Sequence, residues 1–199
     1  MKIFVNFLSA FRITVAFILI PVIMMKLYWV GFVLYLLGAI SDWFDGFLAR
    51  KYKCCSKLGG VLDHIGDKLL VCNTFIIMAL MAPIWAVVIP VILMIARELY
   101  ISGLREFLGT QKIEMPVPKA RFSMGKIKTT LQMIATTLFL LFFAIFMSIT
   151  PTTSNRLVFY LISKLPDAFI FFLWFALVAS LWSATQYTFT FAQKLKKIK

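Results

Sequence analysis

Six long apolar runs decide what kind of fold this chain can adopt. They lie at about residues 7–25, 27–49, 60–82, 84–106, 127–149 and 168–192. Because a helix rises about 1.5 Å per residue, roughly 20 apolar residues are enough to cross the ~30 Å hydrocarbon core of a bilayer. With 62% hydrophobic and 15% charged residues, the composition also argues against a water-soluble domain. The sequence therefore predicts an all-α membrane protein: one domain over residues 1–199, built as a bundle of six transmembrane helices.

Two segments need a separate interpretation. The first run contains Arg12 and Pro21 and is not followed by a small-residue cleavage pattern, so we expect a retained span instead of a removed signal peptide. The apolar patch within residues 150–167 lies between Pro151 and Pro166 and is too short to cross a membrane. This segment is predicted to be a loop with an interfacial turn.

The basic residues are distributed unevenly between the two ends of the predicted helices. The chain has 21 Lys and Arg against 8 Asp and Glu, which gives a net charge of +13. When the spans alternate in direction, all the basic residues except Lys26, Arg156 and Lys164 fall on the side that carries both termini. Because positive loops mark the cytosolic side, both termini are predicted to face the cytosol. Charges clustered between apolar runs indicate contacts with membrane lipids and no nucleic-acid partner.

Half of the carboxylates lie close together in the sequence, at Asp42, Asp45, Asp63 and Asp67. Measured from the outer ends of their spans, Asp42 lies about 22 Å and Asp67 about 24 Å into the ~30 Å core. The spacings i,i+3 and i,i+4 place each pair on one face of its helix. An ionised Asp at the centre of a membrane helix costs about 2.5–3.5 kcal/mol on insertion scales. Four of them at one depth therefore require partners.

Divalent cations are the partners that suit this cluster best. Arg50 and Lys68 are nearby but cannot neutralise four carboxylates, although a structural cluster of Asp–Lys/Arg pairs remains the alternative. Hard oxygen ligands suit Mg²⁺, Mn²⁺ or Ca²⁺. Zinc would favour His and Cys ligands, and the chain has one histidine, His64. We expect His64 to pack or to form hydrogen bonds and not to bind metal.

The aspartates belong to a longer pattern of fixed spacing. The segment SDWFDGFLARKYKCCSKLGGVLDHIGDK fits D-x2-D-G-x2-A-R-x8-G-x3-D-x3-D without a gap. This pattern resembles the signature of the CDP-alcohol phosphatidyltransferase family. The resemblance implies that Asp42, Asp45 and Asp63 hold two metal ions, Mg²⁺ or Mn²⁺, around a diphosphate. It also implies that Asp67 deprotonates the acceptor alcohol and contacts the metal, and that the protein forms a homodimer.

Four further residues of the signature suit a nucleotide diphosphate. Gly46 and Ala49 keep the helix surface flat, so that a nucleotide can approach the backbone. Arg50 supplies a planar fork of donors for the diphosphate. Gly59 opens the third span without a side chain in the way. By resemblance, the donor substrate is CDP-diacylglycerol, and CMP is the leaving group.

Segments outside the signature resemble the glycerol-phosphate branch of the family. They are NFLSAFRI, IARELYISGLREF, GKIKTTLQM and WSATQY. This resemblance implies glycerol 3-phosphate as the acceptor, and the alternative within the family is another alcohol such as inositol phosphate, serine or phosphatidylglycerol. That branch commonly has Asp-Pro where this chain has Asp63-His64. The departure predicts a difference in local helix geometry more than in chemistry.

Several basic residues are candidates for binding the phosphate of such an acceptor. Arg97 lies about 20 Å down the fourth span, where a lone cation needs an anion. Glu98 is adjacent but is predicted to point elsewhere on the helix. Arg105, Lys126 and Lys128 lie at the cytosolic ends of spans four and five. Positive charge that merely flanks the membrane is the alternative interpretation of these residues.

A divalent-cation transporter could also place four aspartates in a membrane. A transporter would have its site near the midplane between repeats. Here the aspartates are displaced toward the cytosol, and no second half of the chain mirrors the first. The preferred prediction is a multi-pass enzyme of the bacterial cytoplasmic (inner) membrane, with its active site facing the cytosol.

Overall fold

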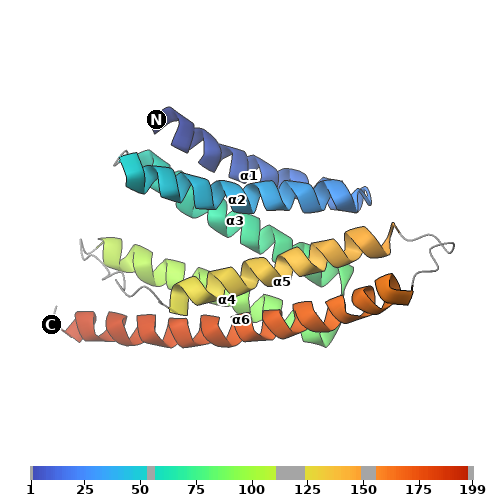
Figure 1. The fold of residues 1–199 in the computed structure, drawn as a ribbon. Helices are drawn as coiled ribbons and strands as arrows, with labels where there is room; N and C mark the ends of the chain where they lie inside the picture. Colours follow the sequence, from blue (N-terminus) through green and yellow to red (C-terminus); the bar gives the residue numbers. More distant parts are fainter. Residues whose placement is uncertain (1, 53–56, 111–123, 149–155, 197–199) are drawn as a thin grey trace.

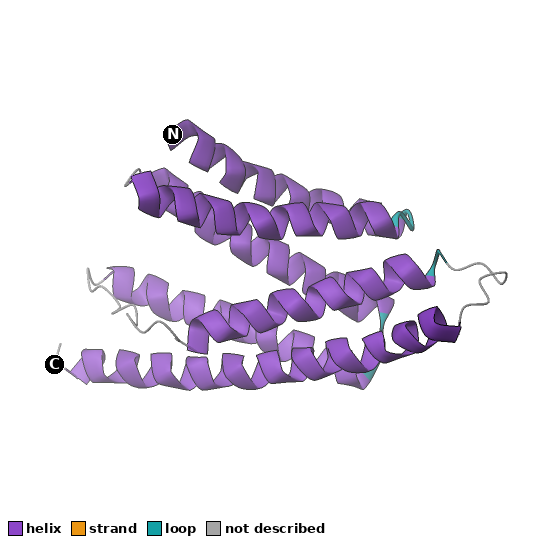
Figure 2. Cartoon of the chain, in the orientation of Figure 1, coloured by secondary structure: helices purple, strands orange, loops and turns teal. Residues whose placement is uncertain are grey.

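Every regular element in the described part of the chain is a helix (Figure 1 and Figure 2). The computed structural model describes residues 2–52, 57–110, 124–148 and 156–196. For some residues in these ranges only the backbone is described, and nothing is said of their side chains. They are residues 2–6, 42–52, 57–58, 63, 124, 156–159, 161 and 195–196. The helices are α1 (Lys2–Met24), α2 (Tyr28–Tyr52), α3 (Lys57–Met81), α4 (Trp85–Thr110), α5 (Met124–Phe146) and α6 (Arg156–Lys196). The prediction of an all-α fold is confirmed.

The start of α6 differs from the sequence prediction. This helix begins at Arg156 and runs for 41 residues through Pro166. The predicted loop over residues 150–167 is therefore wrong from Arg156 onward. Ile162 and Phe169, on either side of Pro166, are both buried, so packing of one face keeps the helix continuous across the proline. Membrane helices tolerate an internal proline because neighbouring groups satisfy the freed backbone.

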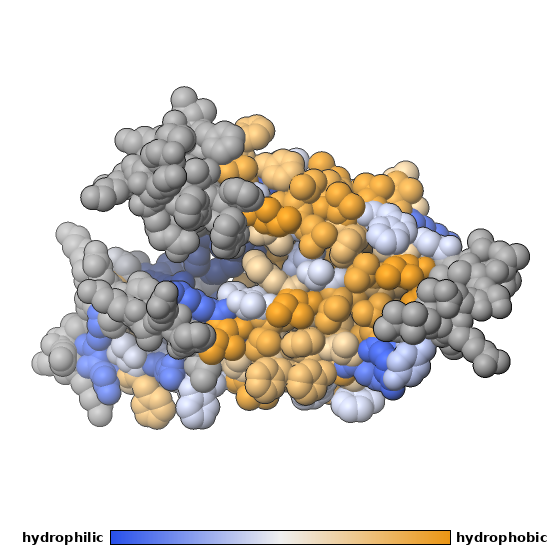
Figure 3. Space-filling model, viewed as in Figure 1, coloured by the Kyte–Doolittle hydropathy of each residue, from blue (hydrophilic) through white to orange (hydrophobic). Residues whose placement is uncertain are grey.

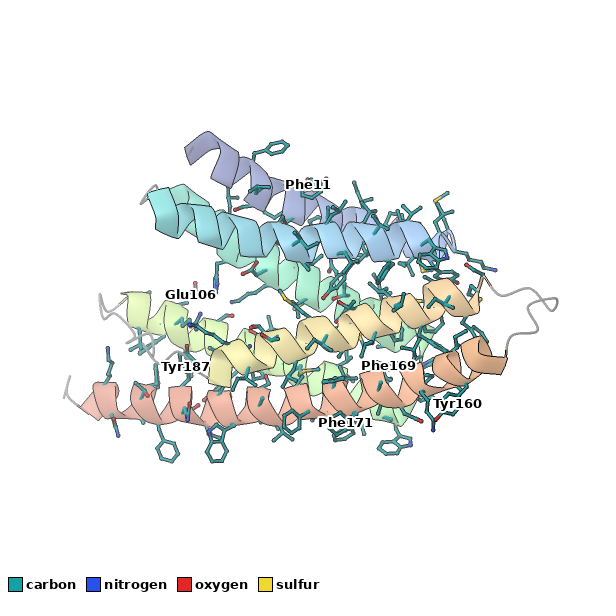
Figure 4. All side chains as sticks on the ribbon, in the orientation of Figure 1. Phe11, Glu106, Tyr160, Phe169, Phe171 and Tyr187 are labelled. Carbon is teal, nitrogen blue, oxygen red and sulfur yellow. The ribbon has the colours of Figure 1, made fainter. Side chains whose placement is uncertain are left out.

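Five helices are long and apolar enough to cross a membrane, namely α1, α3, α4, α5 and α6. In α2, the apolar stretch of the described part, Tyr28–Ser41, is shorter. Figure 3 shows apolar residues across the middle of one face, with hydrophilic residues gathered toward the ends. On the outer face of α6, the exposed rings of Phe171 and Phe175 stack on each other, and Phe171 points away from the bundle (Figure 4). An exposed aromatic face of this kind suits contact with lipid, as expected of a multi-pass membrane protein.

The helices pack as two groups, α1–α3 and α4–α6 (Figure 1). Contacts of α2 and α3 with α5, and of α3 with α4, join the two groups. Large apolar side chains fill the interior, and the fully buried ones include Leu19, Phe75, Met78, Met94, Phe139 and Leu173. Both termini lie at the same end of the bundle. The ends of α2 and α4 and the starts of α3 and α5 lie there too.

A close approach of α1 to α3 occurs beside the last aspartate of the signature. A Cβ atom added to Gly66 would lie 3.4 Å from the carbonyl oxygen of Ser9. That distance is a close van der Waals contact, so the backbone of α1 lies directly against α3 at Gly66. The two helices are thus held together at the level of Asp67.

Candidate active site

The four aspartates of the signature fall on two consecutive, antiparallel helices. Asp42 and Asp45 lie in the second half of α2, and Asp63 and Asp67 lie in the first half of α3. These parts of α2 and α3 share one end of the bundle (Figure 1). Signature residues whose side chains lie outside the described part are Asp42, Asp45, Gly46, Ala49, Arg50 and Asp63. The convergence of their side chains therefore stays a prediction.

Asp67 forms an ion pair with Arg12 of α1, in which the Nη1 atom of Arg12 donates to Oδ1 of Asp67. The Arg12 side chain is 0% exposed, whereas that of Asp67 is 43% exposed. The sequence interpretation considered only Arg50 and Lys68 as cationic neighbours and missed Arg12. The available signal was an arginine inside an apolar run, since a buried cation in a membrane helix needs an anionic partner.

A cavity of about 270 Å³ opens beside Asp67, between α3, α4, α5 and α6. All four residues predicted to bind the acceptor phosphate line it: Arg97, Arg105, Lys126 and Lys128. Asp67 lines the same cavity, as do His64 and Lys68. The structure thus brings the predicted base and the predicted phosphate-binding residues to one space, although their roles stay predictions.

The donor chemistry beside the cavity suits a hard divalent cation. Asp67 presents a half-exposed carboxylate, and carboxylate oxygens are the ligands that Mg²⁺ and Mn²⁺ prefer. Among the side chains that the structure describes, no three His, Cys, Asp or Glu residues form a group able to hold a metal ion. A metal site here would therefore need the carboxylates of Asp42, Asp45 and Asp63.

Gly59, which is predicted to face the nucleotide diphosphate, lies in the first turn of α3 and is buried.

The inner wall of the cavity is organised around one carboxylate oxygen. Oε1 of Glu98 accepts hydrogen bonds from Nη1 of Arg97, at 2.9 Å, and from Nζ of Lys128. Arg97 also donates from Nε to the carbonyl oxygen of Ser180, at 3.2 Å, and from Nη2 to Oγ of Ser183, at 3.1 Å. All three charged side chains are mostly buried, so the pairs are shielded from water. This cluster ties α4 to α5 and to α6.

The expectation that Glu98 points away from Arg97 is therefore wrong. Adjacent residues diverge on a helix, but the long side chains of Arg and Glu bridge that angle, and Lys128 of α5 draws the carboxylate inward. Buried Arg97 finds its anion in Glu98, so its burial alone does not require a phosphate from the acceptor, and its role in acceptor binding stays a prediction. Three N–H groups of Arg97 already donate hydrogen bonds to the protein, so this arginine has fewer donors left for a ligand.

The outer part of the cavity holds cations that are more accessible. Nζ of Lys68 donates to Oγ of Ser102, and that hydroxyl donates to the backbone oxygen of Glu98 at 2.6 Å. Arg105 is exposed and donates from Nη2 to the hydroxyl of Tyr187 at 3.0 Å. Lys126 is exposed as well. These residues come from α3, α4, α5 and α6, so the outer part depends on the packing of four helices.

Sequence interpretation missed several residues of this cavity, namely Ser102, Ser183 and Tyr187, and gave Lys68 only the role of an ion-pair partner. Ser102 follows Glu98 by one helical turn, so it shares that face of α4. Ser183 and Tyr187 also lie one turn apart, on α6, within the WSATQY segment. Recurring polar residues at i,i+4 inside an apolar run were the signal that could have identified this inward face.

Comparison with known proteins places this site in a family. The sequence pattern described as CDP-alcohol phosphatidyltransferase matches residues 2–182. A Rickettsia bellii protein named CDP-diacylglycerol–glycerol-3-phosphate 3-phosphatidyltransferase is 40% identical over 143 residues, which cover 68% of this chain and 74% of that protein. Proteins of the same name from Rickettsia typhi and Salmonella choleraesuis are 40% identical over 149 residues (71% of this chain, 78% of that protein) and 37% identical over 131 residues (64% and 71%). This chain belongs to the CDP-alcohol phosphatidyltransferase family.

Proposed function

We propose that this chain transfers the phosphatidyl group of CDP-diacylglycerol to glycerol 3-phosphate, which yields phosphatidylglycerophosphate and CMP. The observation that carries the proposal is the cavity in which the carboxylate of Asp67 and five Lys and Arg residues meet. A carboxylate beside a cationic pocket suits an acceptor that must lose a proton at one end and carries a phosphate at the other. The names of the relatives, which state this donor and this acceptor, support the same conclusion.

In the proposed reaction, the acceptor hydroxyl oxygen attacks the phosphorus on the lipid side of the diphosphate. The bond from that phosphorus to the oxygen of CMP breaks, and the hydroxyl proton passes to Asp67. Arg12 holds the Asp67 carboxylate from the side of α1. Two ions, Mg²⁺ or Mn²⁺, held by Asp42, Asp45 and Asp63 with a contact from Asp67, would stabilise the charge on the attacking and leaving oxygens.

The remaining residues bind and orient the two substrates. Gly46, Ala49, Arg50 and Gly59 receive the nucleotide diphosphate. Arg105, Lys126 and Lys128 bind the acceptor phosphate, and Arg97 adds positive charge from the inner wall. Charge-assisted hydrogen bonds to a phosphate dianion are shorter and stronger than neutral ones, so a few such donors give useful affinity.

The membrane arrangement forms part of the proposal. Six spanning helices place both termini and the cavity on the cytosolic side of a bacterial inner membrane, where a soluble phosphorylated acceptor is available. The shared end of both termini supports this orientation, with most of the basic residues predicted to lie on that side. The protein acts as a homodimer. A divalent-cation transporter is disfavoured, because the chain belongs to a transferase family and its relatives are named as transferases.

An acceptor panel tests the function directly. Purified protein is incubated with CDP-diacylglycerol, Mg²⁺ and, in separate reactions, labelled glycerol 3-phosphate, inositol phosphate, serine or phosphatidylglycerol. We expect CMP release and a labelled lipid only in the reaction that contains glycerol 3-phosphate. Turnover with a different alcohol would reassign the acceptor. Metal flux in vesicles without CMP release would overturn the enzymatic proposal.

Removing one exposed cation of the cavity is expected to weaken acceptor binding. Arg105→Ala or Lys126→Ala should raise the KM for glycerol 3-phosphate about 10- to 150-fold, because a hydrogen bond to a charged group contributes about 1.5–3 kcal/mol. The KM for CDP-diacylglycerol should change much less. Both side chains are exposed, so their loss should leave the fold intact.

Lys164→Ala is the control for this measurement, since Lys164 is an exposed lysine of α6 far along the chain from the cavity residues of that helix. Its kinetics should match those of the unaltered protein. If Arg105→Ala instead raises only the KM for CDP-diacylglycerol, Arg105 serves the nucleotide lipid, and the argument for a phosphorylated acceptor loses its best residue.

A further inference from the structure

Arg105 of α4 makes two different contacts with a single residue of α6, Tyr187. Its Nη2 atom donates a hydrogen bond to the Tyr187 hydroxyl at 3.0 Å. Its guanidinium carbon also lies 5.1 Å from the centre of the Tyr187 ring, within the range of a cation–π interaction. Tyr187 rises from α6 toward α4 (Figure 4), and both residues line the cavity.

These two contacts restrict a side chain that would otherwise be mobile. Arg105 is exposed, and a free arginine side chain samples many rotamers. The hydroxyl fixes one nitrogen of the guanidinium, and the ring limits how the guanidinium plane can turn. Tyr187 engages one of the five N–H donors of the guanidinium, so the contact leaves donor capacity for an anion. An arginine that is oriented in advance loses less entropy when it binds a phosphate.

Tyr187 itself is well placed to act as a fixed support. It is partly buried and belongs to the same face of α6 as Ser183, one turn earlier. Ser183 accepts a hydrogen bond from buried Arg97, which anchors this part of α6 to α4. The support for Arg105 is therefore built on a helix that the inner cluster already holds in place.

We propose that Tyr187 is a positioning residue for the acceptor: it holds the Arg105 guanidinium at the cavity so that Arg105 can bind the phosphate of the acceptor. The inference rests on the proposed function, because it assigns to Arg105 the acceptor phosphate. Tyr187 acts through Arg105 and needs no contact with the substrate of its own.

A second tyrosine provides a matched control. Tyr100 of α4 shares a hydrogen bond of 3.2 Å with Thr188 of α6, so it too joins these two helices through a phenolic hydroxyl. Neither Tyr100 nor Thr188 lines the cavity. Tyr100→Phe therefore removes a comparable bond between α4 and α6 without touching the proposed site, and it reports any purely structural cost of losing such a bond.

The experiment measures steady-state kinetics and thermal stability for Tyr187→Phe, Tyr187→Leu, Arg105→Ala, the double variant Tyr187→Phe/Arg105→Ala and Tyr100→Phe. Loss of the hydroxyl in Tyr187→Phe should raise the KM for glycerol 3-phosphate about 2- to 12-fold. Loss of the ring in Tyr187→Leu should raise it a further 2- to 5-fold or so. The KM for CDP-diacylglycerol and the Tm should stay close to those of Tyr100→Phe. The double variant should match Arg105→Ala alone, because Tyr187 has nothing left to position.

Three outcomes would overturn the inference, and they can be told apart. If the KM effects of Tyr187→Phe and Arg105→Ala multiply in the double variant, Tyr187 acts on the acceptor independently of Arg105. If Arg105→Ala raises the acceptor KM but neither Tyr187 variant does, Arg105 needs no positioning, and the proposed acceptor site stands. If Arg105→Ala leaves the acceptor KM unchanged, the acceptor site and the inference both fail.

Discussion

Asp67→Asn is expected to lower kcat by about 10²–10⁴, the usual cost of losing a general base. Asparagine keeps the size of the side chain and an oxygen that can still accept the hydrogen bond from Arg12, but it cannot take up the proton of the acceptor hydroxyl. The hydrogen bond can persist, but buried Arg12 loses the charge of its partner, so the Tm must be measured to separate a loss of stability from the loss of the base. The measurement is kcat at saturating substrates and saturating Mg²⁺, together with the Tm.

Asp167→Asn is a matched control for this substitution, because Asp167 is an exposed aspartate of α6 that does not line the cavity. It should retain the activity of the unaltered protein. Excess Mg²⁺ separates the two roles proposed for Asp67. If a high metal concentration returns Asp67→Asn to nearly full activity, Asp67 is a metal ligand only, and the base must be sought elsewhere.

Chelation of divalent cations is expected to abolish activity. The signature places Asp42, Asp45, Asp63 and Asp67 near one end of α2 and α3, and a described cationic partner, Arg12, is shown for Asp67. Carboxylates inside a membrane are costly without compensating charge, and the diphosphate adds further negative charge at the same place. EDTA should therefore stop CMP release, and added Mg²⁺ or Mn²⁺ should restore it. Full turnover in rigorously metal-free buffer would contradict the two-metal mechanism.

The positions of the helices could be predicted because hydropathy alone sets them. An apolar run of about 20 residues has few alternatives to a spanning helix, so the predicted ranges and the observed helices agree along most of the chain. The exception is instructive. Pro151 and Pro166 suggested a loop, but the apolar residues around Pro166 pack into the bundle, and tertiary contacts override the local preference of proline.

The meeting of Asp67 with the basic residues could also be predicted, since it follows from depth. Asp67 and Arg97 are predicted to lie about 24 Å and about 20 Å from the outer ends of their spans, and Lys128 lies near the start of the fifth span. Side chains at similar depth in a small bundle are candidates for a shared site, and all three line the cavity. Pairing is a different matter. Depth does not say which helices are neighbours or how each is rotated, so the ion pair of Arg12 with Asp67 could not be derived from spacing.

The cluster around Glu98 illustrates the same limit. Helical angles alone separate neighbouring residues, and they gave the wrong direction for Glu98 relative to Arg97. The outcome depends on Lys128, which α5 brings to the same carboxylate oxygen. A charge on another helix, Lys128 of α5, decides the rotamer of Glu98. The sequence of α4 alone therefore could not predict it.

The α6 helix is longer than is needed to cross the membrane. A helix of 41 residues measures about 60 Å, twice the ~30 Å hydrocarbon core. Even a tilt of about 40° leaves roughly 45 Å along the bilayer normal, so α6 must project beyond the hydrocarbon. The part that supports Arg97 and Arg105, from Ser180 to Tyr187, lies in its second half. The exposed Phe171 face and the wall that would receive a water-soluble acceptor therefore occupy different stretches of one continuous helix.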